Sequence, residues 1–198
     1  MSVRVETWRI FCALCFPPQV RTRVMQHIAK LREGLPEDQT SWSRKESVHL
    51  TLKFLGEIPI ASVPTFSEAV SRAVAGISSF PIVVEGAGVF PNSRRPRVLW
   101  VGLSDPSGSL NDLHSQLDFE SASSGFPKEV RAFHPHITLA RLRDSRHSQV
   151  IVRAHQRLQF EPEAFTATEL LVIRSELNTG GSKYSVVSRH PLRERDRT

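Results

Sequence analysis

The chain has 198 residues, of which 39% are hydrophobic and 23% charged, a composition typical of globular proteins. This length suits one domain or two small lobes that share a core, and no apolar run approaches the roughly 18 residues of a membrane helix. The net charge of +6, carried largely by 21 arginines, favours a polyanionic partner such as nucleic acid, because arginine pairs bidentately with phosphate. An arginine-rich solvated surface explains the charge equally well.

The first half of the chain predicts a strand, a helix and a second strand. Residues 8–16 form a hydrophobic run closed by two prolines, which is typical of a strand and not of a signal peptide. An amphipathic helix is expected from Gln19 to Gly34, with the apolar stripe Val20, Val24, Ile28 and Leu31. Residues 49–55 alternate with period two, which predicts a half-buried strand. Its two expected faces hold Leu50, Leu52 and Phe54 on one side and His49, Thr51 and Lys53 on the other.

The second half repeats this order. A second helix is expected from Pro64, and strands are expected at 80–85 and 98–103, on either side of a turn-rich segment. A third helix around residues 110–117 ends in the stretch SASSG, a strand follows at 136–140, and a fourth helix is expected at 145–157. The last expected strands are 169–175 and 184–188, joined by the loop ELNTGGSK. No linker separates the halves, so we expect residues 1–198 to form one two-lobed α+β unit.

Cys12 and Cys15 form a C-x-x-C pair inside the first predicted strand. Residues three apart on a strand point to opposite faces, which does not suit a shared metal or a redox pair. We therefore expect two buried core thiols.

Two four-residue stretches share the pattern of histidine, branched aliphatic, threonine and leucine. They are 49–52 (HLTL) and 136–139 (HITL), and they begin 87 residues apart. This composition gives about 0.005 such stretches by chance, so accidental repetition is disfavoured. Duplication of a structural strand is the alternative. A structural strand does not need histidine on its polar face, so we favour a functional role.

Each motif places an imidazole and a hydroxyl on the same strand face, about 6.6 Å apart. Two such strands facing each other would surround one phosphorus atom with two imidazoles and two hydroxyls. Because the unperturbed pKa of imidazole is ~6.5, one ring can be neutral and the other protonated near neutral pH. That combination is what concerted acid and base catalysis requires.

His134 has the same parity as His136 and Thr138, so we expect it to orient substrate. An H-x-H pair on one strand face is also a zinc-binding pattern, and a zinc site is the alternative. No carboxylate or third histidine lies nearby in the sequence, and only His136 has the phase of the first motif. We therefore expect no metal.

These motifs make the chain resemble the two-histidine phosphoesterase superfamily, which is defined by tandem H-x-T-x motifs. Within it, the chain is most similar to the RNA 2′,3′-cyclic phosphodiesterases, also called 2′-5′ RNA ligases. The similarity extends to RIFCALCFP, HLTLKFLGE, GAGVFPNSRRPRVLWVGL, FHPHITLAR and LLVIRSELNTGGSKYSV, and it is weakest at residues 143–165. It implies a bilobal α+β fold in which two pseudo-symmetric antiparallel sheets line a central cleft, with helices outside.

The resemblance also implies an activity: hydrolysis of RNA 2′,3′-cyclic phosphate termini to 2′-phosphomonoesters, without a cofactor. By position, His49 would be the proton donor to the departing 3′ oxygen and His136 the proton acceptor that activates water. Thr51 and Thr138 would hold the nonbridging oxygens, where negative charge builds. If a 5′-hydroxyl replaces water, the reverse reaction gives a 2′-5′ ligation.

Further residues are candidates for binding the substrate. Arg141 ends the TLAR stretch, and Arg94 and Arg95 lie in a loop whose counterpart borders the cleft in the family, so they could follow an RNA backbone. For these arginines a solvated or ion-paired surface charge is the alternative. Tyr184 could stack a terminal base, whereas for Phe90 we favour a core role. Lys53 has the parity of His49 and is expected near the anion.

Two rival functions stay open. One is an AMP-type nucleotide-binding module without turnover, and the other is a phosphodiesterase for 2′-5′ oligoadenylates or other cyclic phosphates. A pure binder does not need two titrating groups, so the pair of histidines favours an enzyme. We expect a monomeric cytoplasmic protein without a membrane association or an obligatory protein partner, acting on RNA ends or nucleotides that carry a 2′,3′-cyclic phosphate.

Overall fold

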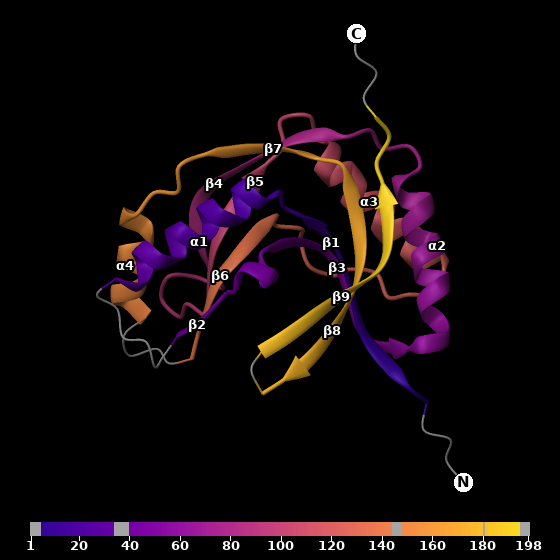
Figure 1. Ribbon diagram of the computed structural model, residues 1–198, viewed down its shortest axis with the longest axis horizontal. Coiled ribbons are helices and arrows are strands. Elements are labelled where there is room, and N and C mark those ends of the chain that lie inside the picture. Colours follow the sequence, from indigo (N-terminus) through magenta and orange to yellow (C-terminus); the bar gives the residue numbers. More distant parts are fainter. Residues whose placement is uncertain (1–4, 34–39, 144–147, 180, 195–198) are drawn as a thin grey trace.

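Two antiparallel sheets with four α-helices make up the described part of the chain (Figure 1). The computed structural model describes residues 5–33, 40–143, 148–179 and 181–194. Its α+β class and its paired antiparallel sheets agree with the fold expected from the sequence.

The first sheet has the strand order β3-β1-β8-β9. Its strands are β1 (Thr7–Cys15), β3 (His49–Pro59), β8 (Glu169–Asn178) and β9 (Gly181–Pro191). Helices α2 (Val63–Val74) and α3 (Ser109–Ser123) pack against each other, and each also contacts this sheet. Figure 1 shows this pair of helices beside β9 and β3, so the first motif lies in a strand that helices support from one side.

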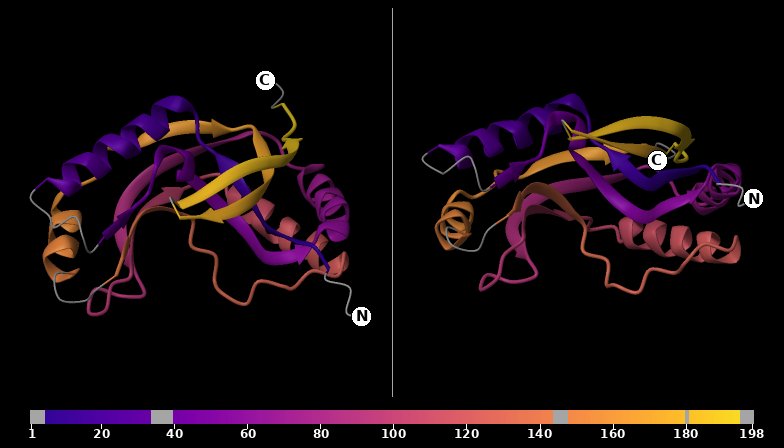
Figure 2. Two further views of the ribbon diagram at one scale, coloured as in Figure 1. Left: turned by 60° about the horizontal axis from the view of Figure 1, so that its bottom comes forward. Right: turned by 90° about the horizontal axis from the view of Figure 1, so that it is seen from below.

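The second sheet has the order β2-β6-β5-β4-β7. Its strands are β2 (Thr40–Trp42), β4 (Phe80–Phe90), β5 (Val98–Ser104), β6 (His136–Leu142) and β7 (Glu163–Ala167). Helices α1 (Pro18–Arg32) and α4 (Ser148–Arg157) contact each other and the β7 and β4 strands, and short 3-10 turns occupy Lys45–Ser47 and Ile60–Ser62. The strands of this sheet curve strongly, as Figure 2 shows. The second motif begins β6, and β6 approaches β3.

The helices agree well with the periodicity of the sequence. The stripe Val20, Val24, Ile28 and Leu31 on α1 is buried, and α3 ends within the Ser/Gly stretch 121–125. The expected end of α1 at Gly34 and the first three residues of the expected fourth helix, 145–147, lie outside the described residues.

Six strands are longer than predicted, β1 has the predicted length, and two strands were not predicted at all. β4 continues through residues 86–90, the first part of the expected turn-rich segment 86–97, and the β8-β9 hairpin extends into the expected loop ELNTGGSK. Each extension forms a regular ladder with a neighbouring strand, and Gly86, with φ of +72°, sits at a bulge between Glu85 and Ala87. β2 and β7 are short, and their hydrogen bonds go to strands distant in the sequence, which a local pattern does not reveal.

A β-bulge at Leu52 reverses the predicted faces of the first motif strand. Thr51 pairs with Ala13 and Lys53 pairs with Cys12, so Leu52 has no partner on β1. Directly opposed residues share a face, and Cys12 faces the main core. Lys53 therefore points to the core side, away from His49 and Thr51, and Phe54 is 47% exposed. The predicted alternation is correct as far as Leu52 and wrong beyond it.

The second motif strand has the same irregularity at the same motif position. Thr138 pairs with Trp100 and Ala140 with Leu99, which leaves Leu139 without a partner on β5. Arg141 pairs with Val98, two residues from Trp100 on the same face of β5. The bulge thus returns Arg141 to the face of Thr138, although simple alternation would place it on the opposite one.

The two cysteines differ in exposure. Cys12 is fully buried, whereas Cys15 is exposed at the end of β1, opposite His49. The prediction of two buried thiols was wrong for Cys15, because it is the last residue of β1 and lies beyond the apolar cluster that covers Phe11 and Ala13 on the same face. None of the helices in the described ranges combines the length and apolar character that spanning a membrane requires.

Candidate active site

Both motifs open into one cavity of about 690 Å³. Its lining comes from β3, from β9 and the end of β8 in the first sheet, from β2 and β6 in the second, and from the segment after β2. The lining residues are Thr40, Ser41, Trp42, Ser43, Arg44, Ser47, His49, Thr51, His136, Thr138, Arg141, Arg143, Asn178, Thr179, Gly181, Ser182 and Tyr184. The structure therefore brings together the two histidines and two threonines that the sequence singled out.

Aromatic rings enclose His49. Phe11 stacks on the imidazole with ring centroids 4.9 Å apart, and Tyr184 meets it edge-on at 5.4 Å. Phe11 belongs to a small apolar cluster with Ala13, Leu171 and Ile173. These neighbours displace water, so burial lowers the pKa of His49 to about 4. The free protein holds this imidazole neutral near pH 7.

His136 has a defined orientation. Its Nδ1–H donates to the carbonyl oxygen of His134 at 2.6 Å. Because a carbonyl oxygen can only accept a hydrogen bond, Nδ1 must carry the proton. Nε2 then carries the lone pair. Burial lowers the pKa of His136, and the nearby charges of Arg141 and His134 also lower it. The hydrogen bond to the His134 carbonyl raises it, but the net effect is a lowered pKa. Phe90 contacts the ring edge-on at 4.9 Å.

The second motif is held in place by the segment after β2. Ser43 donates its hydroxyl to the carbonyl of Thr138 at 2.7 Å, and its backbone N–H donates to Leu139 at 2.8 Å. These bonds tie the bulged backbone of β6 to the wall of the cavity, so the Thr138 hydroxyl projects from a fixed backbone.

The cavity is electropositive. Arg44, Arg141 and Arg143 line it, and among the residues that the structure describes no aspartate or glutamate does. Serine and threonine hydroxyls make up much of the remaining wall. Guanidinium groups and hydroxyls are donors that suit phosphate oxygens. This lining fits an anion of the size of a nucleotide.

Of the other predicted binding residues, one lines the cavity and the rest lie outside its lining. Tyr184 lines the cavity, but it packs edgewise on His49. His134 is exposed and acts through its carbonyl, while Arg94 and Arg95 lie in the β4-β5 turn, where Asn92 caps their backbone N–H groups. Neither these two arginines nor His134 belongs to the cavity lining.

Lys53 has partners elsewhere. Its side chain is 4% exposed, and its Nζ lies 2.6 Å from Asp118 on α3. The prediction that it shares the anion-facing side with His49 was wrong, because the bulge at Leu52 turns it toward α3.

Several site residues were missed by the sequence reasoning. Arg44, Ser43 and Arg143 line the cavity, yet they stand outside any motif and no periodicity marks them. Trp100 lies beside Phe90 and His136, in the space left by Gly88, where a Cβ would overlap its ring. A glycine in a strand was the one available signal of such a close approach.

The arrangement suits proton transfer at a phosphate. One imidazole with a fixed Nε2 lone pair and a second, desolvated imidazole come from opposite sheets into an electropositive cavity. In the described part of the chain, no three His, Cys, Asp or Glu side chains gather as metal ligands, so the alternative zinc pair of His134 and His136 gains no third ligand there.

Comparisons with known proteins agree with this geometry. A sequence model of the 2′-5′ RNA ligase superfamily matches residues 16–179. The RNA 2′,3′-cyclic phosphodiesterase of Methanothermobacter thermautotrophicus is 32% identical over 162 residues, which cover 80% of this chain and 87% of that protein. Thermus thermophilus TT0787 superimposes with a TM-score of 0.77 at 26% identity, covering 94% of this chain and 98% of its own. Escherichia coli LigT complexed with 3′-AMP gives 0.75 at 26% identity, with 94% and 99% covered.

Proposed function

Because the chain belongs to the 2′-5′ RNA ligase superfamily, we propose that it is a hydrolase that opens RNA 2′,3′-cyclic phosphate termini to 2′-phosphomonoesters. The observation that carries the proposal is the meeting of both H-x-T-L motifs in one cavity, one from each sheet. The relatives named RNA 2′,3′-cyclic phosphodiesterase support the same substrate class.

His136 is the proposed general base. Its Nδ1–H is engaged by the His134 carbonyl, so Nε2 is the nitrogen available to accept a proton from water. The water oxygen then forms a bond to phosphorus while the bond from phosphorus to the 3′ oxygen breaks. The lowered pKa of His136 keeps its lone pair free near neutral pH, as a base requires.

His49 is the proposed acid that protonates the departing 3′ oxygen. Burial holds its pKa at about 4 in the free protein, too low for a proton donor at neutral pH. A cyclic phosphodiester carries one negative charge, and an adjacent anion in a desolvated site favours the imidazolium. Substrate binding would therefore load His49 with the proton that it later delivers, which leaves a 3′-hydroxyl and a 2′-phosphomonoester.

Thr51, Thr138 and Arg141 are the proposed phosphate ligands. The two hydroxyls share strand faces with the two histidines, and the bulge at Leu139 brings the Arg141 guanidinium to the same cavity. Donors fixed in place before reaction stabilise the charge that builds on the nonbridging oxygens. The reverse reaction, with an RNA 5′-hydroxyl in place of water, would give a 2′-5′ linkage, but water at ~55 M favours hydrolysis unless both ends are held in place.

The second candidate is a nucleotide-binding module without turnover. Its support is the structure of LigT complexed with 3′-AMP, a neighbour of the same fold. The defined Nε2 lone pair of His136 and the second imidazole favour catalysis, because binding alone needs only donors.

The deciding experiment is incubation with a short RNA that ends in a 2′,3′-cyclic phosphate, in EDTA and without ATP. We expect a 2′-monophosphate product, abolished by His49→Ala and by His136→Ala. Nucleotide affinity without turnover by the wild-type protein would move the binding module to first place. Turnover that survives both substitutions would refute the two-histidine mechanism.

We further propose that residues 1–198 act as one bilobal, monomeric unit on RNA ends in the cytoplasm. The support is that the cavity needs both sheets for its lining. Light scattering coupled to gel filtration should give the mass of one 22.3 kDa chain, and a dimer mass would contradict the proposal.

A further inference from the structure

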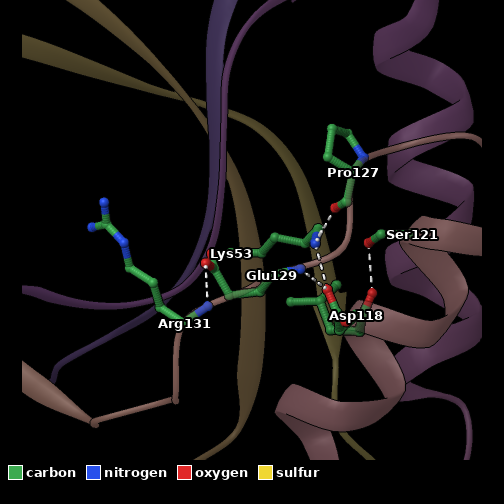
Figure 3. A network of polar contacts seen from close by, with 7 residues as sticks. Lys53, Asp118, Ser121, Pro127, Glu129 and Arg131 are labelled. Carbon is green, nitrogen blue, oxygen red and sulfur yellow. Dashed lines mark hydrogen bonds and ion pairs between the residues drawn. The ribbon is translucent and has the colours of Figure 1, made fainter.

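A buried lysine, on the face of β3 opposite His49, joins three separate segments (Figure 3). The Lys53 Nζ on β3 donates to Asp118 Oδ1 on α3 at 2.6 Å and to the carbonyl of Pro127 at 2.8 Å. Asp118 Oδ1 also accepts the backbone N–H of Glu129 at 2.9 Å. One ammonium group and one carboxylate thus hold the first part of the segment that follows α3, at residues 127–129.

Burying a lysine is unfavourable unless its charge is paired and hydrogen-bonded. Lys53 meets both conditions, although it is 4% exposed. Partial burial alone raises the pKa of Asp118, but the hydrogen bonds from Lys53 and Glu129 outweigh it, and the pKa is lowered. The network is therefore a charged clamp, whereas an apolar side chain at position 53 would satisfy the core without holding the segment.

The clamped segment leads directly to His136. Further along it, Phe133 stacks on His114 of α3, with ring centroids 4.0 Å apart and planes 9° from parallel. The Pro135 carbonyl accepts the backbone N–H of Leu103 on β5, and the His134 carbonyl between them accepts Nδ1–H of His136. The group that sets the tautomer of His136 therefore sits on a segment that α3 and Lys53 fix from one end and β5 from the other.

Lys53 also lies one residue beyond the first motif. The bulge at Leu52 turns it from the His49 face to the α3 face, so a short stretch of β3 carries His49 on one side of the sheet and the clamp on the other. The two histidines belong to different sheets, and their relative placement must be maintained through contacts of this kind.

We propose that Lys53 is a positioning residue, which couples the strand of His49 to the segment whose His134 carbonyl orients His136. The inference rests on the proposed function for its catalytic consequence, but the orientation of His136 is measurable without turnover. A simple structural ion pair would stabilise the fold and leave the properties of His136 unchanged.

The test compares two variants with a matched control. Lys53→Met removes the charge at similar volume and leaves Asp118 unpaired. Lys53→Met/Asp118→Asn also removes the uncompensated carboxylate charge and keeps an acceptor for the Glu129 N–H, so it should recover stability, but it still lacks the bond to Pro127. Val70 is a fully buried residue of α2, the helix that packs against α3. The control Val70→Ala should destabilise α2 and leave the contacts of Lys53 and Asp118 in place.

We expect both Lys53 variants to lose about 10- to 100-fold in kcat with little change in KM, because phosphate ligands remain while the base is displaced. The hydrogen bond to the His134 carbonyl raises the pKa of His136, so its loss should shift the acid limb of the pH-rate profile to lower pH. The nearby charged groups, His134 and Arg141, are the same in the variants and the wild-type protein. Nitrogen NMR should show His136 losing its single Nδ1–H tautomer. Val70→Ala should keep the wild-type values.

Wild-type kcat, acid limb and tautomer in the double variant would overturn the positioning role. Absence of wild-type turnover would instead refute the proposed function. In that case the tautomer of His136 in the double variant still decides the positioning role. Retention of the single Nδ1–H form would overturn that role, and a mixture of tautomers would support it.

Discussion

Protonation of His49 should make the stability of the protein depend on pH. The unfolded chain binds a proton on this imidazole near pH 6.5, whereas the folded protein does so only near pH 4, because Phe11 and Tyr184 exclude water from the ring. Between these values the unfolded state binds more protons, so stability falls as the pH falls from 6.5 to 4. Above this window His49 contributes no pH dependence.

The size of the effect follows from the two pKa values. The full difference corresponds to about 3 kcal/mol, and between pH 7 and pH 5 it amounts to about 2 kcal/mol. His49→Gln removes the titrating group, so its free energy of unfolding should fall by about 2 kcal/mol less than that of the wild-type protein over this interval. Other buried histidines contribute equally to both proteins and cancel in the comparison.

Urea unfolding at pH 7 and pH 5 measures the change in the free energy of unfolding for the wild-type protein and for His49→Gln. His134→Gln, an exposed histidine changed to the same residue, controls for loss of an imidazole. The mechanism requires that a bound anion favours the imidazolium form of His49. At pH 5, inorganic phosphate should therefore stabilise the wild-type protein more than it stabilises His49→Gln. Equal pH dependence of wild type and His49→Gln, within about 0.5 kcal/mol, would refute the desolvation argument.

Three further predictions concern other parts of the site. Arg141→Met should lower kcat/KM for a 2′,3′-cyclic phosphate about 10- to 100-fold, the range expected for one charged hydrogen bond, in steady-state kinetics. Gly88→Ala should cost about 1–3 kcal/mol in urea unfolding, because its Cβ would overlap the ring of Trp100. A thiol reagent should modify Cys15 alone in the native protein and both Cys12 and Cys15 after unfolding, since Cys12 is buried and burial raises its pKa.

Each of these has a matched comparison. Gly76→Ala places a Cβ in open space and should have little effect, so equal losses at the two glycines would contradict the role assigned to Trp100. Arg94→Met removes an arginine outside the cavity lining, and a loss equal to that of Arg141→Met would indicate general attraction of RNA rather than a phosphate ligand. Reaction of two thiols at equal rates in the native protein would refute the burial of Cys12.

The helices and the two motif strands were predictable because their signals are local. Val20, Val24, Ile28 and Leu31 repeat with helical spacing, and the alternation from His49 to Leu52 has the period of a strand. The short strands β2 and β7 carry no such signal. They exist because partners distant in the sequence supply their hydrogen bonds, as Trp42 pairs with Ala140.

What the sequence determined by itself was the chemistry: two repeated H-x-T-L motifs whose improbability points to a paired acid and base, within a chain that resembles a known phosphoesterase family. Only the tertiary structure decided which neighbours take part. Alternation from the first motif places Lys53 on the face of His49, and the bulge at Leu52 turns it to the opposite face, whereas the bulge at Leu139 brings Arg141 to the face of Thr138. A bulge depends on pairing with β1 or β5 and leaves no local mark in these strands. The environment of each histidine likewise comes from residues distant in the sequence, and that environment sets its pKa and its tautomer.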